Sequence, residues 1–204
     1  MEAAAIPTPV AHDDHHHGPP AAHRSSRVEP EVLGILLFII SELMLFGAFF
    51  AAYFFIRVVA DSEWPPGDGL PVSVAATNAA ILLSSSITMH WTDLSSKRDN
   101  AFGMRAGIIS TIALGSTFLF IQINEYIHIG FTPKTDASAS IFFGLTGLHG
   151  AHVLIGLLLL TMSAVRIFKG RVGPTSHTGL EVPGIYWHFV DFMWIIVFTT
   201  IYVL

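Results

Sequence analysis

The sequence predicts an all-α integral membrane protein, a bundle of five transmembrane helices, and three observations support this fold class. Of the 204 residues, 52% are hydrophobic and only 12% are charged, whereas about a quarter of the residues in an ordinary soluble domain are charged. The apolar residues form five long blocks, and the ten Lys and Arg residues stand mostly at the block ends. The blocks are too long and too uniformly apolar for the strands of a barrel, so helices remain as the spanning element.

Each block has the length that a membrane span requires, about 20 residues at 1.5 Å per residue for roughly 30 Å of hydrocarbon. The transmembrane domain covers residues 32–204, with spans at about 32–58, 72–91, 104–127, 138–167 and 183–204. Turn-forming residues separate them at 64–69, 95–100, 130–136 and 170–181. Because these connections are short, we expect consecutive helices to pack antiparallel.

Residues 1–31 precede the first span and are rich in Pro, Ala and His, including the run HDDHHH at 12–17. Such a segment cannot build a core, and we interpret it as a flexible tail. No small-residue cleavage site follows the first apolar block, which argues against a signal peptide.

The distribution of basic residues predicts the orientation. With five crossings, the tail and the second and fourth connections share one side of the membrane, and eight of the ten Lys and Arg residues lie there. Only Arg57 and Lys134 lie on the other side. By the positive-inside rule the N-terminus is cytoplasmic and Leu204 is outside.

Composition also excludes several classes of function. The formal net charge is −5, and no basic face exists for nucleic acid. The chain has no cysteine, which removes disulfides, thiolate metal sites and Cys nucleophiles together.

Glu42 is the most unusual residue of the first span, because it stands ten residues into it, roughly 15 Å deep at 1.5 Å per residue. An ionised carboxylate near the midplane costs about 2.5–3.5 kcal/mol on insertion scales. We therefore expect a protonated Glu42 that faces the bundle. Its role is either proton transfer or ligand contact, or a hydrogen bond that holds a neighbouring helix.

Three further pairs of polar residues stand at i, i+3, so that the members of each pair share a helix face. They are Gln122 with Glu125, His149 with His152, and His188 with Asp191. Glu125 also precedes His128 by three residues, which predicts an acid–imidazole pair near the outer end of that helix. Tyr186, Trp187, His188 and Asp191 together predict a polar anchor at the start of the last span.

A metal or haem site is the alternative interpretation of these residues, since bundle metal centres use inward-facing Glu and His. The carboxylate-bridged pattern needs Glu-x-x-His on each of two helices, and only Glu125 with His128 satisfies it. We therefore favour helix–helix hydrogen bonds, which hold helices that otherwise have only small residues and van der Waals contact.

Four motifs resemble subunit III of the haem-copper respiratory oxidases, in its bacterial five-helix form. The segment 186–191 (YWHFVD), followed by Trp194, is similar to the C-terminal signature of that family, and the segment 146–153 (TGLHGAHV) is similar to its fourth-helix motif. Gln122, Glu125 and Tyr126 match its Q-x-x-E-Y element, and Glu42 after Ser41 matches its buried glutamate. The motifs occur in the family's order and span nearly all of the membrane domain.

The resemblance implies a subunit of the bacterial plasma membrane that binds no haem or copper and has no catalytic centre. It implies direct packing on the catalytic subunit I, association with subunit II, and support of proton uptake by the proton-pumping complex, whose haem and copper lie in the partner subunits. It further implies bound phospholipids in a cleft that separates the first two helices from the last three, with Glu42 near this lipid. A respiratory supercomplex is a further possible partner.

Three alternatives remain open from the sequence. The donor is cytochrome c or a quinol: Val190 and the loop at 64–66 favour cytochrome c, whereas the His-rich tail is similar to quinol oxidase members. A self-sufficient membrane haem or metal protein, built on His149, His152 and Glu125, is the hypothesis from another class. A small transporter is disfavoured, because no inverted repeat or broken-helix pair is evident. No chain of titratable residues is evident from one face to the other, so we do not expect Glu42 to carry protons across.

Overall fold

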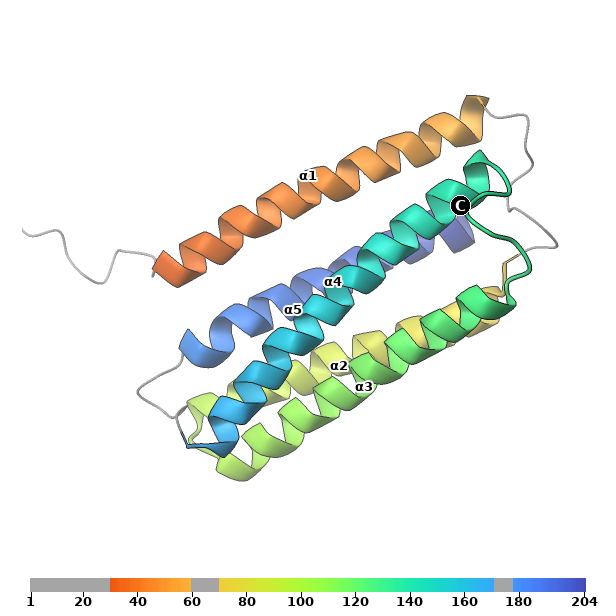
Figure 1. Ribbon diagram of the computed structural model, residues 1–204. Coiled ribbons are helices and arrows are strands. Elements are labelled where there is room, and N and C mark those ends of the chain that lie inside the picture. The colour runs from red at the N-terminus through yellow and green to blue at the C-terminus, as the bar shows by residue number, and fades with distance from the viewer. Residues whose placement is uncertain (1–29, 60–69, 171–177) are drawn as a thin grey trace, which may run out of the picture.

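The computed structural model describes residues 30–59, 70–170 and 178–204, and these segments are almost entirely helical. Five helices are long and apolar enough to cross a membrane, which confirms the predicted all-α bundle (Figure 1). Helix α1 covers Pro30–Val59, α2 Val72–Lys97, α3 Ala101–His128, α4 Ala137–Phe168 and α5 Thr178–Phe198. A short π-helix, η2, continues α5 over Thr199–Val203. The His-rich run at 12–17 and the predicted turn at 64–69 lie outside the described residues.

The second helix extends beyond the apolar block at 72–91 and reaches Lys97, into the segment predicted as a turn. Its last turn is polar, and an ion pair between Asp93 and Lys97, 2.7 Å apart at i, i+4, supports helix there. The turn itself is short, and Asp99 adopts a left-handed conformation with φ of 53°. Asn100 then caps α3 by accepting a hydrogen bond from the backbone N–H of Gly103.

The last helix starts at Thr178, five residues before the predicted start at Pro183, which lies inside the helix. A proline has no N–H to donate to the carbonyl four residues earlier, here that of Gly179. The Ser163 hydroxyl of α4 donates to this carbonyl at 3.2 Å. The neighbouring helix thus supplies the missing donor, as occurs at prolines of membrane helices.

Helices α2, α3, α4 and α5 form a packed group, which we call the four-helix group (Figure 1). Small residues bring α2 and α3 close together: a Cβ added at Gly103 or Gly107 would lie 2.5 Å from Ser95 Oγ or 2.3 Å from Thr92 Oγ1. The Thr88 and Thr111 hydroxyls bond across the same interface at 2.8 Å. This agrees with the small-residue packing that holds helices together in membranes.

Helix α1 lies apart from α2 and packs against α4 and α5 (Figure 1). The expected grouping of the first two helices against the last three is therefore wrong: the division falls after the first helix. The physical reason is the tight small-residue contact of α2 with α3 at Gly103 and Gly107, whereas the glycines of α1 have no close neighbour.

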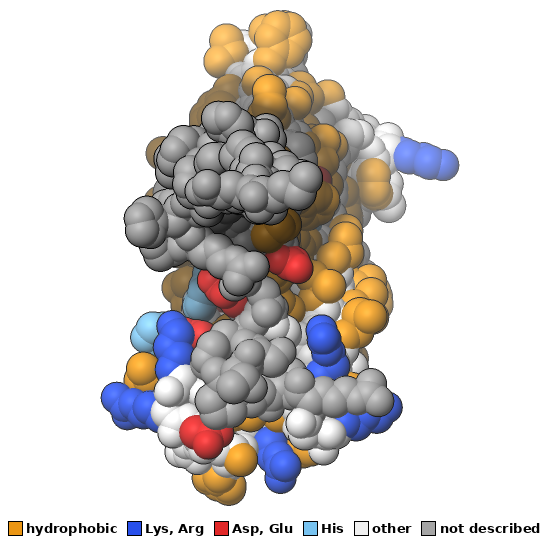
Figure 2. Space-filling view, turned by 90° about the vertical axis from the view of Figure 1, so that its left-hand side faces the viewer, with side chains coloured by type: hydrophobic (Ala, Val, Ile, Leu, Met, Phe, Trp, Pro, Cys, Tyr) orange, Lys and Arg blue, Asp and Glu red, His pale blue; other side chains and the backbone are white. Residues whose placement is uncertain are grey.

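Charged residues mark one end of the bundle, where α2 and α4 end and α3 begins. Lys and Arg gather around this end in Figure 2, and we call it the basic end; it holds Lys97, Arg98, Arg105, Arg166 and Lys169. The opposite end, where α1 and α3 end, holds Arg57 and Lys134, and we call it the far end. The asymmetry agrees with the predicted orientation, which stays a prediction.

Candidate functional site

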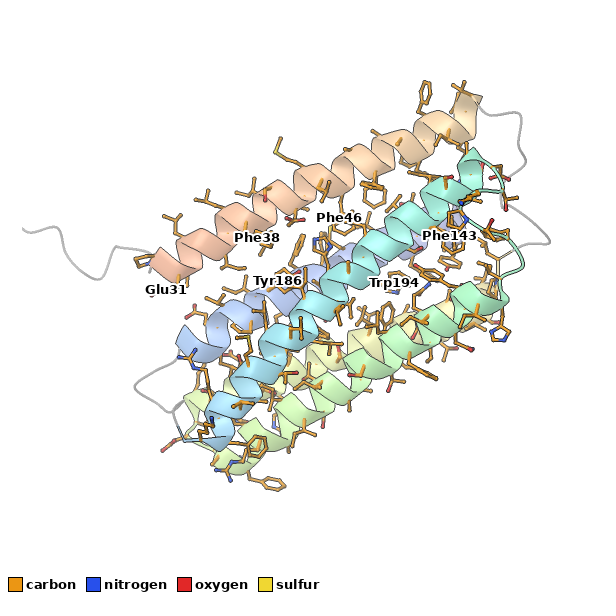
Figure 3. All side chains as sticks on the ribbon, viewed as in Figure 1. Glu31, Phe38, Phe46, Phe143, Tyr186 and Trp194 are labelled. Atoms are coloured by element: carbon orange, nitrogen blue, oxygen red, sulfur yellow. The ribbon has the colours of Figure 1, made fainter. Side chains whose placement is uncertain are left out.

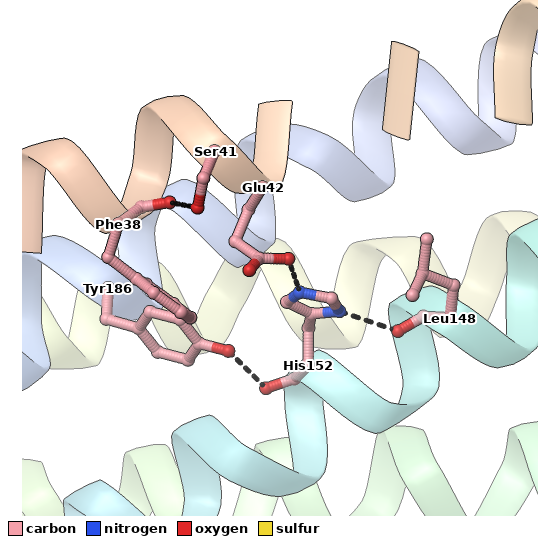
Figure 4. Close-up of polar contacts among 6 residues, drawn as sticks. All are labelled: Phe38, Ser41, Glu42, Leu148, His152 and Tyr186. Atoms are coloured by element: carbon pink, nitrogen blue, oxygen red, sulfur yellow. Dashed lines mark hydrogen bonds and ion pairs between the residues drawn. The ribbon is translucent and has the colours of Figure 1, made fainter. Parts of the chain in front are cut away.

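A hydrogen bond between α1 and α4 joins the most unusual acid of the sequence to one of the predicted histidines. Glu42 Oε2 lies 2.8 Å from His152 Nε2, and the Glu42 side chain is 16% exposed (Figure 4). His152 Nδ1 donates to the carbonyl of Leu148 at 2.8 Å. The Glu42–His152 bond therefore contains one proton, which lies on the acid or on the ring.

Aromatic contacts surround this bond and add to the attachment of α1. The Phe46 ring lies 5.1 Å from the His152 ring, and the Phe38 ring lies 6.1 Å from that of Tyr186 on α5. Figure 3 shows Phe38 and Phe46 on the side of α1 that faces α5. The Tyr186 hydroxyl in turn donates to the carbonyl of His152 at 3.3 Å.

A second attachment of α1 lies at the far end. The Tyr53 hydroxyl donates to the carbonyl of Thr200 at 2.8 Å and accepts from Arg57 at 2.7 Å. Arg57 also donates to the carbonyl of Leu204. These bonds tie α1 to the π-helix η2 and to Leu204 directly after it, through backbone carbonyls as acceptors. The charge pattern placed Arg57 at this side of the membrane, but neither Tyr53 nor the contact with the end of the chain was predicted from the sequence.

Trp187 occupies the centre of the four-helix group and is fully buried. A Cβ at Gly115 of α3 would lie 2.6 Å from its ring, and a Cβ at Gly156 of α4 would lie 2.8 Å from it. Its indole N–H donates to the Ser85 hydroxyl of α2 at 3.0 Å. One side chain of α5 thus contacts all three other helices, in a cradle of two glycines.

The Q-x-x-E-Y residues of α3 lie at the far end of the same group. Glu125 accepts from the Tyr202 hydroxyl at 2.9 Å, and the Tyr126 hydroxyl donates to Thr146 Oγ1 at 2.7 Å. Gln122 is buried beside them, with 2% of its surface exposed. The predicted pair of Glu125 with His128 is wrong, because His128 Nδ1 donates to the carbonyl of Asn124 at 2.8 Å instead.

His149 and His152 share a helix but face different neighbours. His149 is fully buried, and its ring lies 4.7 Å from the Trp194 ring and 5.8 Å from the Phe118 ring. His152 instead faces α1. No group of three or more His, Cys, Asp or Glu side chains in the described ranges is arranged to hold a metal ion.

His188 and Asp191 also differ in environment. His188 is exposed, and its Nδ1 lies 2.7 Å from the Ser86 hydroxyl of α2. Asp191 is buried, with 3% of its surface exposed. The Ser86 hydroxyl lies close to this carboxyl but outside hydrogen-bonding geometry.

Comparison with known proteins identifies the family of this chain. The family model described as cytochrome c oxidase subunit III matches residues 17–204. The chain belongs to the cytochrome c oxidase subunit III family. It is 41% identical over 184 residues to the cytochrome c oxidase subunit 3 of Thermostichus vulcanus, covering 89% of this chain and 91% of that protein.

More distant relatives carry the same name. The probable cytochrome c oxidase subunit 3 of Mycobacterium leprae is 35% identical over 183 residues, 88% of this chain and 91% of that protein. The cytochrome c oxidase subunit 3 of Oryctolagus cuniculus is 36% identical over 177 residues, 83% of this chain and 67% of that protein. As a member of the subunit III family the chain is a component of a haem-copper oxidase, an oxidoreductase complex.

Within this subunit III chain, every predicted site residue except His128 contacts another helix or lies in the core, and the exposed His188 bonds Ser86 of α2. The motif residues could be predicted from the sequence, but the residues that they contact could not. Tyr202, Ser85 and Ser86 are ordinary residues of apolar spans, and only the packing of the helices shows that they contact motif residues. The one available signal was spacing, since Ser85 and Ser86 interrupt an apolar span.

Proposed function

We propose that the chain is the non-catalytic subunit III of a proton-pumping oxidase that passes electrons from cytochrome c to oxygen. It packs on subunit I, with subunit II in the same complex, and haem and copper are held by those partners. The names of its relatives favour cytochrome c as the donor over a quinol.

One observation carries the assignment of a structural role: the buried motif residues serve contacts between helices. Glu42 bonds His152, Trp187 bonds Ser85, and Glu125 bonds Tyr202. In a self-sufficient haem or metal protein these side chains would instead point toward one common binding site. The described residues show them at separate helix interfaces.

Phospholipid binding is the second part of the proposal. Helix α1 exposes Leu37, Met44 and Phe55, each by more than half of its surface, although it is held to the four-helix group at mid-height and at the far end. Acyl chains that pack on this helix would complete its contacts within the membrane. Such lipids would hold α1 in place beside subunit I and so support proton uptake there.

Purification of the tagged full-length chain from native membranes tests the central claim. We expect recovery of a complex with the visible spectrum of haem, and oxidation of reduced cytochrome c by it. Recovery of the chain without a haem-containing partner contradicts the proposal. Oxidation of a quinol, but not of cytochrome c, would keep the subunit assignment and overturn the donor.

A spectrum and metal analysis of the chain after its separation from the partners distinguishes the alternative class. We expect no Soret band and no stoichiometric metal. A Soret band that stays with this chain would establish the haem-protein hypothesis in its place.

A further inference from the structure

Six buried side chains of the four-helix group have polar atoms without a hydrogen-bond partner among the described residues. They are Asn78, Gln122, Glu125, His149, Asp191 and Trp194. Each is at most 6% exposed. A buried polar atom without a partner costs about 1–3 kcal/mol, and lipid offers it no alternative. Six such side chains in one core indicate a bound ligand that forms the missing hydrogen bonds.

The contacts on α5 and its neighbours place these atoms one after another along the bundle. Asp191 and Trp194 stand three residues apart on α5 and share a face. The Trp194 ring contacts the rings of His149 on α4, at 4.7 Å, and Phe118 on α3, at 4.9 Å. The Trp194 side chain of α5, with its unpaired N–H, therefore lies next to the His149 ring of α4, with its two unpaired nitrogens.

The series continues along α3. The Asn78 side chain of α2 donates to the carbonyl of Phe118 at 3.2 Å, with its own oxygen unpaired. Gln122 follows Phe118 by one helical turn, and Glu125 follows Gln122 by three residues. The polar atoms thus run from Asp191, on the side of the basic end, to Glu125 at the far end.

A hollow lies near each end of this series, and the one at the far end is lined by Glu125 itself. At the basic end, a hollow of about 520 Å³ between α2 and α5 is lined by His90, Asp93 and His188, among others. His188 bonds Ser86 of α2 and precedes Asp191 on α5 by three residues, so that the two share a helix face. At the far end, a hollow of about 440 Å³ is lined by Leu70, Asn124, Glu125 and His128, among others.

The chemistry of the unpaired atoms identifies the ligand. Asn78, Glu125 and Asp191 present oxygens, Trp194 presents only a donor, and the Gln122 amide and His149 ring present both kinds. A metal ion would reject the donors. Water donates and accepts, and buried water usually makes about three bonds to such groups.

We propose that the four-helix group binds a file of water molecules that runs from the hollow beside His188, past Asp191, to the hollow beside Glu125. The contacting rings of Phe118, His149 and Trp194 divide it into two segments. The sequence showed no such series, because its members come from four helices.

Two tryptophans of α5 provide a matched test in the intact, wild-type complex. Trp187 and Trp194 are both at most 1% exposed, but the Trp187 N–H is bonded to Ser85 in its glycine cradle, whereas the Trp194 N–H lies in the proposed file. Radiolytic hydroxyl-radical labelling modifies buried side chains next to bound water. We expect Trp194 to be labelled several-fold more than Trp187. Equal labelling of the two residues overturns the proposal.

A structure of the complex at a resolution that orders water is the second measurement. We expect density within hydrogen-bonding distance of Asp191, Trp194 and Gln122. If these side chains instead bond one another directly, for example Asp191 to Ser86 and Gln122 to Tyr202, the file does not exist. Neither result depends on the electron donor, so failure here is separate from failure of the proposed function.

Discussion

Two glycines, at 115 and 156, allow Trp187 to sit at the centre of the bundle, because any side chain there would overlap its ring. Gly147 lies on the same helix as Gly156, and a Cβ there would meet nothing within 4 Å. Both glycines stand on α4, but only Gly156 has a neighbouring side chain packed against it. They therefore separate the cost of a clash from the general effect of replacing a helical glycine.

We expect Gly156→Ala to destabilise the protein by about 1–3 kcal/mol, the usual cost of overpacking a close-packed core. Gly147→Ala should be neutral or slightly stabilising, since alanine favours helix by up to about 1 kcal/mol over glycine. The measurement is the temperature at which half of the chain dissociates from the purified complex. Equal midpoints for the two variants would show that the cradle tolerates a methyl group.

Glu42→Gln should assemble and keep almost all of the initial turnover, because the Gln amide can still donate to His152 Nε2. Glu42→Leu leaves that nitrogen unpaired and should cost about 1–3 kcal/mol. Thermal dissociation and initial oxygen consumption of the two purified complexes check both parts. A complete loss of proton pumping in assembled Glu42→Gln enzyme would assign this acid a role in proton transfer.

At the scale of the helix, α1 differs from the other four because polar bonds fix it at two levels rather than continuous packing. The middle level is Glu42 with His152, and the far level is Tyr53 with Thr200. Gly144 adds a close contact, since a Cβ there would lie 3.0 Å from the Phe49 ring. We expect α1 to respond to the loss of either polar level as a rigid rod that pivots on the other.

Spin labels on exposed residues of α1 and α4 measure this response. The chain has no cysteine, so Met44→Cys and Leu158→Cys, at positions 74% and 58% exposed, provide the only labelling sites. We expect Tyr53→Phe to broaden the distance distribution between the labels. The control, Tyr126→Phe, removes a hydroxyl bond within the four-helix group and should leave the distribution unchanged. Broadening in the control alone would contradict the two-level attachment.

Across the whole molecule, apolar length was enough to predict five helices, whereas their grouping could not be predicted. Hydropathy treats each block separately and does not show that Gly107 of α3 fits Thr92 of α2. The end of α2 and the start of α5 were misplaced because hydropathy does not register polar bonds: Lys97 is helical through its bond to Asp93, and residues before Pro183 are helical because Ser163 supplies a donor. In the candidate site, spacing found the motif residues but not partners distant in sequence.

The basic end also predicts how the whole molecule is oriented in the membrane. Lys169 lies at the basic end and Lys134 at the far end, on a chain without cysteine. A membrane-impermeant maleimide should label Lys134→Cys in spheroplasts, in which the plasma membrane is intact and its outer face is accessible. It should label Lys169→Cys only after the membrane is opened. The reverse pattern would invert the predicted topology.

The position of Trp187 has a consequence for biosynthesis. Its side chain contacts α2, α3 and α4 at once, yet it lies on α5, which is made after these three helices. Helices α2, α3 and α4 therefore enter the bilayer with the space between Gly115 and Gly156 unfilled, and the bundle closes only when α5 is inserted. A chain interrupted before residue 187 leaves this space open and the bundle incomplete.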